Sequence, residues 1–87
     1  MTVHSDVSQL NALVLEYGLS PGTIHRMVGV SGTTWYKWIN GHNVAARYVP
    51  RLQKVLSEVR NVANAGELAW NHQKNNLRMK ELAKIFD

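Results

Sequence analysis

Cysteine is absent from this 87-residue chain, and prolines, acidic residues and long apolar runs are few. Without cysteine, neither disulfides nor thiolate metal sites can stabilise the fold, and a reducing cytoplasm is the compartment that this composition favours. No segment approaches the roughly 20 apolar residues of a membrane span. The first residues, MTVHSDVSQ, lack the basic and apolar regions of a signal peptide. We therefore expect one small soluble cytoplasmic domain that is stabilised by packing alone.

Acidic residues are also missing from one long internal segment, which contains none between Glu16 and Glu58. The same segment carries five basic residues, namely Arg26, Lys37, Arg47, Arg51 and Lys54. The formal net charge of +4 would by itself fit many proteins that never bind nucleic acid. A segment of uniform positive charge, however, favours a polyanion with closely spaced phosphates as the partner. The alternative is a basic surface that only faces water.

Apolar residues recur three and four positions apart along most of the chain, which predicts an all-α fold of about five helices and no strand. Ser5 or Asp6 is expected to cap a first helix over residues 7–17, which ends at Gly18. A second helix over 21–28 is expected to start at Ser20 and Pro21, because serine accepts a backbone N–H at a cap and proline suits the first helical position.

A short break at Gly29-Val30-Ser31 separates the second helix from a third, over residues 32–40. A fourth helix carries an apolar face from Val49 to Val62, with Pro50 in its first turn. If that helix begins near Ala45 instead, the proline must bend it. After a break at 64–66, a fifth helix is expected over residues 67–86.

The most specific pattern lies in LSPGTIHRMVGVSGTTWYKWINGH, residues 19–42. Two helices that cross at roughly 90–120° need a glycine to turn and apolar residues at their crossing. These positions are occupied by Ile24, Val28, Gly29, Val30, Trp35 and Trp38. With its flanking helices, over residues 7–62, the segment resembles the helix-turn-helix of the lambda repressor and Cro family (XRE-type). It departs from the family at His25, where alanine is usual, and at Pro21, which replaces a common glutamine.

The resemblance implies that residues 32–40 form a recognition helix that enters the major groove of DNA. At about 100° per residue from a buried side of Trp35 and Trp38, the residues Thr33, Lys37 and Asn40 point outward. Lysine can donate to guanine, asparagine can pair with adenine, and a threonine methyl can touch thymine. The predicted base contacts are Gly32, Thr33, Thr34, Tyr36, Lys37 and Asn40. Both tryptophans are predicted to pack in the core and not to stack on bases.

Contacts with DNA phosphates are predicted around this helix. The resemblance places Arg47 and Arg51 in or after the loop where family members hold the DNA backbone. Residues at the start of the second helix are also candidates, because helix N-termini favour anions. The complete set is Ser20, Thr23, His42, Asn43, Arg47 and Arg51.

The domain organisation expected from this reading has three parts: an N-terminal arm over 1–6, a DNA-binding domain over 7–63 and a C-terminal helix within 64–87. The C-terminal helix is expected to carry an apolar stripe of Leu68, Met79, Leu82 and Phe86. The stripe has two possible roles, which are an isologous dimer contact and coverage of the monomer's own core.

The expected function is a sequence-specific double-stranded DNA-binding transcriptional regulator, similar to the small repressors of phages and mobile elements, that binds a two-fold operator as a homodimer. It would act in the cytoplasm, at the nucleoid or in a host cell. The alternatives are a helical protein-interaction module or inhibitor, and an accessory factor for excision or recombination. No Walker loop, His-Glu-x-x-His motif or carboxylate pair is present, and the four histidines are scattered. We therefore expect no enzymatic activity, metal, small-molecule cofactor or membrane partner.

Overall fold

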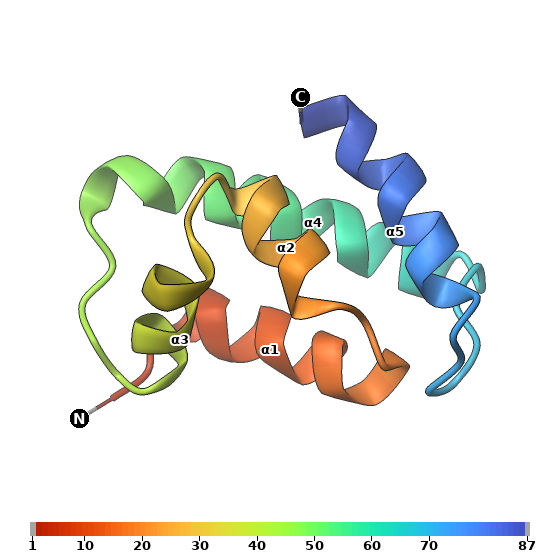
Figure 1. Ribbon diagram of the computed structural model, residues 1–87, viewed down its shortest axis with the longest axis horizontal. Coiled ribbons are helices and arrows are strands. Elements are labelled where there is room, and N and C mark those ends of the chain that lie inside the picture. Colours follow the sequence, from red (N-terminus) through yellow and green to blue (C-terminus); the bar gives the residue numbers. More distant parts are fainter. Residues whose placement is uncertain (1, 87) are drawn as a thin grey trace.

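The computed structural model describes residues 2–86; Met1 and Asp87, the outermost residues of the predicted arm and C-terminal segment, lie outside these. Over this range the fold is all-helical, as predicted, and α2 and α3 form the predicted helix-turn-helix (Figure 1). The α-helices are α1 (Ser5–Tyr17), α2 (Pro21–Val28), α3 (Gly32–Ile39), α4 (Val49–Asn64) and α5 (Asn75–Ala83). Two short 3₁₀ turns, η1 (Ala46–Tyr48) and η2 (Lys84–Phe86), precede α4 and follow α5.

The turn between α2 and α3 has the geometry that its sequence predicts. Gly29 adopts a left-handed φ of 85°, a conformation that side chains disfavour, and its N–H donates to the carbonyls of His25 and Arg26. After the turn, the Ser31 hydroxyl accepts the backbone N–H of Thr34 at 3.2 Å and so caps α3. The glycine ends one helix and the serine begins the next.

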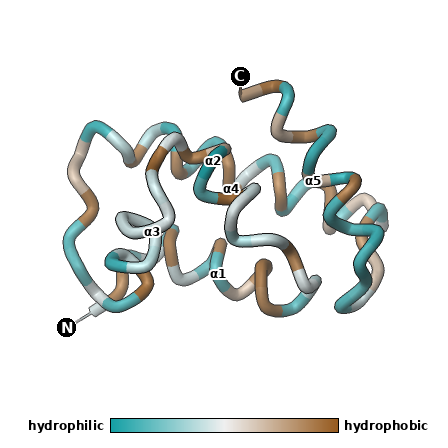
Figure 2. The backbone as a smooth tube through the Cα atoms, in the orientation of Figure 1, coloured by the Kyte–Doolittle hydropathy of each residue, from teal (hydrophilic) through white to brown (hydrophobic). Residues whose placement is uncertain are grey.

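All five helices contribute side chains to one core, with α1 against α4 and α5 against α2. Figure 2 shows hydrophilic and hydrophobic residues alternating along the chain, as expected for helices with one buried face. Trp35 and Trp38 are each 3% exposed, which confirms that they belong to the core. The two rings meet edge to face, and Trp38 also meets the Tyr48 ring at a centroid distance of 5.5 Å. This contact fixes α3 against η1 and the start of α4.

Helix α4 begins at Val49, so Pro50 lies in its first turn as expected, and the alternative start near Ala45 is not adopted. The predicted start of α1 is wrong by two residues. His4 caps α1, because its Nδ1 accepts the Asp6 N–H and its carbonyl accepts the Ser8 N–H. Ser5 and Asp6, assigned to the arm from the sequence, therefore lie inside the helix.

The predicted extent of the fifth helix is also wrong, because α5 starts only at Asn75 and residues 67–74 form turns. These turns cross the end of α1, where the Asn71 N–H donates to the Glu16 carbonyl. Asn75, only 3% exposed, donates to the carbonyls of Tyr17 and Ala69 and accepts the Ala69 N–H. These hydrogen bonds of Asn75 stabilise the turns over residues 67–74, where the sequence predicts a helix.

Asn76 joins the same end of α1 to α2. Its Oδ1 accepts the Ser20 N–H at 2.7 Å, and its Nδ2 donates to the Gly18 carbonyl at 3.4 Å. The expectation that the Ser20 hydroxyl caps α2 is not met: Ser20 occupies the N-cap position, but its side chain makes no capping hydrogen bond.

The apolar stripe of the C-terminal segment is buried in the monomer. Leu68, Met79, Leu82 and Phe86 belong to the same core as α1–α4, and Met79 is fully buried. Of the two roles expected for the stripe, its burial corresponds to coverage of the monomer's own core. Within residues 2–86, no helix is long and apolar enough to cross a membrane.

Candidate nucleic-acid interface

The outward face of α3 is polar and exposed, as the helical geometry predicts. Thr33, Lys37 and Asn40 are all exposed, and Tyr36 beside them is 65% exposed. The Asn40 side-chain amide donates to the Tyr36 carbonyl at 2.8 Å, which holds it at the end of the helix. That bond leaves the amide oxygen and one N–H of Asn40 for an external partner.

A hollow of about 500 Å³ lies beside the C-terminal half of α3 and is bordered by the loop that follows it. The hollow brings together five of the predicted DNA-contact residues, which are Thr34, Lys37, His42, Asn43 and Arg47. Thr34 and Lys37 come from α3, His42 and Asn43 from the loop, and Arg47 from η1. Residues predicted separately for base and phosphate contacts thus form one continuous surface.

Tyr48, which belongs to none of the sequence motifs, positions Arg47 at this hollow. The Arg47 guanidinium lies 4.9 Å from the Tyr48 ring centroid and donates to the Tyr48 hydroxyl at 3.2 Å. Because Tyr48 also packs on Trp38, the arginine is anchored indirectly to α3. The adjacency of arginine and tyrosine was the only sign of this role in the sequence.

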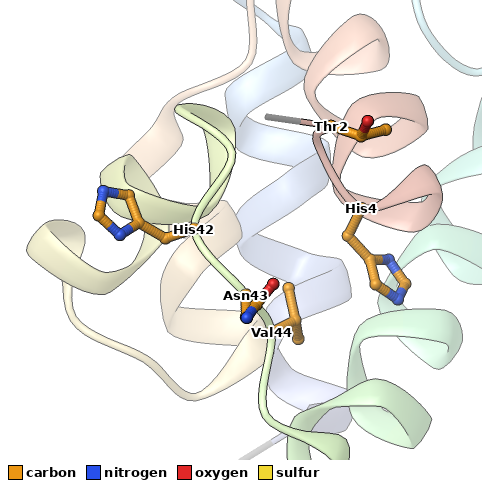
Figure 3. Close-up of a pocket in the computed structure, with 5 residues that line it drawn as sticks. All are labelled: Thr2, His4, His42, Asn43 and Val44. Carbon is orange, nitrogen blue, oxygen red and sulfur yellow. The ribbon is translucent and has the colours of Figure 1, made fainter.

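The N-terminal residues lie beside the same loop. Figure 3 shows Thr2 and His4 across a pocket from Asn43 and Val44, with the His42 ring turned away from His4. The two imidazoles do not converge on a common point. Within residues 2–86, no cluster of three or more histidine, aspartate or glutamate side chains has the geometry to hold a metal ion.

The structure does not bring every predicted contact into this surface. Arg51 points toward the C-terminal end of α2, where its Nε donates to the Met27 carbonyl at 2.7 Å and its Nη2 to the Phe86 carbonyl at 2.8 Å. Ser20 and Thr23 are partly buried at the start of α2. Gly32 and Tyr36 line a different hollow, on the other flank of α3.

The His25 ring is accommodated by the absence of a side chain at Gly32. Its Nδ1 lies 2.9 Å from the Val30 carbonyl, so the ring bridges α2 and the turn. A Cβ atom at Gly32 would lie only 3.3 Å from the His25 Nε2. The absence of a side chain at Gly32 therefore makes room for the imidazole of His25.

No acidic side chain lines either of the two hollows that flank α3, or the pocket between the N-terminal residues and the loop after α3. Among the side chains of residues 2–86, an ion pair joins Arg78 to Glu67, away from α3. Lys37 and Arg47 are thus not neutralised by an acidic neighbour in the described structure. Their charges are available to an external anion.

No protein-family model, curated protein or solved structure matches the chain. What the protein does is therefore inferred from its own geometry and charge.

Proposed function

We propose that the protein is a sequence-specific double-stranded DNA-binding transcriptional regulator that inserts α3 into the major groove. The observation that carries this proposal is the acid-free polar face of α3, which continues into the hollow containing Lys37, His42, Asn43 and Arg47. The resemblance of residues 19–42 to the lambda repressor and Cro helix-turn-helix supports it.

The side chains on this face suit the edges of bases. The major groove is about 12 Å wide and admits a helix. In it, Lys37 would donate to guanine O6 or N7, Asn40 would pair with adenine N6 and N7, and the Thr33 methyl would contact thymine. Arg47 and the loop residues would hold phosphates, which fix the register without reading sequence.

We further propose that two copies bind a two-fold operator and repress transcription by covering a promoter, as small phage and mobile-element repressors do. A single helix-turn-helix reads one half-site, and two-fold operators match two-fold dimers. Because the stripe of α5 is buried in the monomer, the contact between copies would use another surface.

The test is selection of bound duplexes from a random pool, followed by affinity measurements on the selected site at several salt concentrations. Selected sequences should contain two related half-sites about one helical turn apart. If each subunit neutralises about four phosphates, log affinity should fall against log salt with a slope near −7 for a dimer. A flat salt response with no enriched sequence would contradict the proposal and favour a protein-interaction module.

A further inference from the structure

A second concave surface lies on the flank of α3 opposite Lys37, between α1, α2 and α3. This hollow of about 420 Å³ contains no charged side chain among its lining residues. Leu15 and Tyr36, which are 73% and 65% exposed, both line it. Two of the largest exposed apolar side chains in the described structure therefore border the same space, which favours an apolar occupant.

The interior of the hollow is preformed. Val14 and Trp35 are almost fully buried side chains that line it. Two glycines, Gly22 and Gly32, leave parts of its wall without side chains. A Cβ atom at Gly22 would meet nothing closer than the Ser20 hydroxyl at 3.6 Å, so open space adjoins this position.

The His25 ring gives the hollow a chemical preference. The lining residues with polar side-chain atoms are Asn11, His25, Trp35 and Tyr36. The Val30 carbonyl can only accept a hydrogen bond, so the neutral His25 ring carries its proton on Nδ1 and Nε2 is an acceptor. Nε2 lies beside Gly32 and has no hydrogen-bond partner in the part of the chain that the structure describes. An acceptor without a partner in the described chain therefore borders a mainly apolar space.

We propose that this hollow binds a small neutral aromatic molecule with one N–H or O–H donor, such as an indole or a phenol, and that the bound molecule weakens DNA binding. Its volume falls in the range of small-molecule sites, which is about 300–1,000 Å³. The uncharged lining disfavours an ionic ligand, the exposed Tyr36 ring offers an aromatic surface, and the His25 Nε2 can accept a hydrogen bond from the N–H or O–H of the ligand.

The effect on DNA binding rests on the proposed function. Gly32 and Tyr36 border the hollow and also flank the outward face of α3. A ring held against them occupies space next to the first turn of the recognition helix, which would enter the major groove first. Ligand and DNA would thus compete for the same approach to α3.

The binding step is tested on the full chain without DNA, by titrating indole and, in parallel, 1-methylindole, which lacks the N–H donor. Backbone and tryptophan N–H signals are followed by NMR. Indole should produce saturable shifts at Trp35, Tyr36 and Gly32, and 1-methylindole should bind about 2- to 10-fold more weakly because one hydrogen bond is missing. No saturable shift at these residues, or equal affinity for both compounds, would overturn the assignment.

A matched pair of variants tests the position of the ligand. Gly22→Leu extends a side chain into the open space, whereas Gly22→Ala leaves most of it open. Indole affinity should fall more than 10-fold in Gly22→Leu and stay within about 3-fold of wild type in Gly22→Ala. Undiminished indole binding by folded Gly22→Leu would overturn the site. Shifts at the same residues that depend on protein concentration without indole would also overturn it, because a second copy would then fill the hollow.

The coupling step is tested by measuring DNA affinity with and without saturating indole. Saturating indole should lower the DNA affinity of the wild-type protein at least several-fold and should leave the DNA affinity of Gly22→Leu unchanged. Indole binding that leaves DNA affinity unchanged would overturn the coupling. If the protein bound no DNA at all, the NMR titration would still test the ligand site, so the failures of the two proposals are distinguishable.

Discussion

Replacing Arg51 with alanine separates a structural role from a DNA contact. The sequence predicts that Arg51 binds phosphate, whereas in the structure its guanidinium donates to the Met27 and Phe86 carbonyls at 2.7 and 2.8 Å. The Met27 carbonyl is one of the last four of α2, which have no partner within their own helix. Arg51 thus caps α2 and attaches η2 to it.

The expected loss of stability follows from these contacts. A hydrogen bond from a charged donor contributes about 1.5–3 kcal/mol when buried. Arg51 is exposed and water screens its charge, so we expect about 1 kcal/mol for each bond and about 2 kcal/mol in total. For a domain of this size, such a loss should lower Tm by roughly 8–16 °C.

The measurement is thermal and urea unfolding of Arg51→Ala, with Arg51→Lys as the control. A lysine keeps the charge but lacks the fork that reaches two carbonyls, so it should recover about half of the lost stability. The salt slope of DNA binding should stay unchanged in Arg51→Ala. In Arg47→Ala it should fall by about one unit per subunit. An Arg51→Ala protein with wild-type Tm and a slope reduced by one would refute the structural role and support the phosphate contact.

Three further substitutions test the recognition helix and the core. Lys37→Ala should weaken the free energy of binding to the selected DNA site by about 1–3 kcal/mol and relax the base preference at one position, without changing Tm. An unchanged base-preference profile would contradict the orientation of α3. Trp38→Ala should cost about 3–5 kcal/mol of unfolding free energy in urea titrations, and a wild-type midpoint would argue against its burial. Asn75→Asp replaces two donated hydrogen bonds by repulsion from carbonyl oxygens, which should raise the pKa of the new carboxyl above its usual range. The Tm of this variant should therefore lie further below the wild-type Tm at pH 7 than at pH 4, and an equal difference at both pH values would contradict the reasoning.

The parts of the fold that were predictable from the sequence depend on local chemistry. Pro21 marks the start of α2, Gly29 requires a left-handed turn, and the spacing of Trp35 and Trp38 defines the buried side of α3. Each of these signals acts within a few residues. The exposure of Thr33, Lys37 and Asn40 follows directly from that spacing.

The parts that were not predictable depend on contacts between distant residues. Asn75 joins a carbonyl 58 positions earlier in the chain, and Arg51 joins carbonyls 24 and 35 positions away. Helical periodicity contains no information about such pairs, so it predicts a helix over residues 67–74, where the structure has turns. His72 and Asn75, two polar residues that dilute the apolar stripe, are the indications in the sequence that the helix is interrupted there.

The packing of α5 against α2 has a consequence for the order of events during synthesis. A ribosome that has made only the first 74 residues has not yet produced Met79, Leu82 and Phe86, the buried side chains of the last turns. Until they emerge, α2 lacks the side chains of α5 that pack against it, and Arg51 cannot form its hydrogen bond to the Phe86 carbonyl. Because chains fold from the N-terminus as they are made, we expect the helix-turn-helix to become rigid only after α5 has left the ribosome.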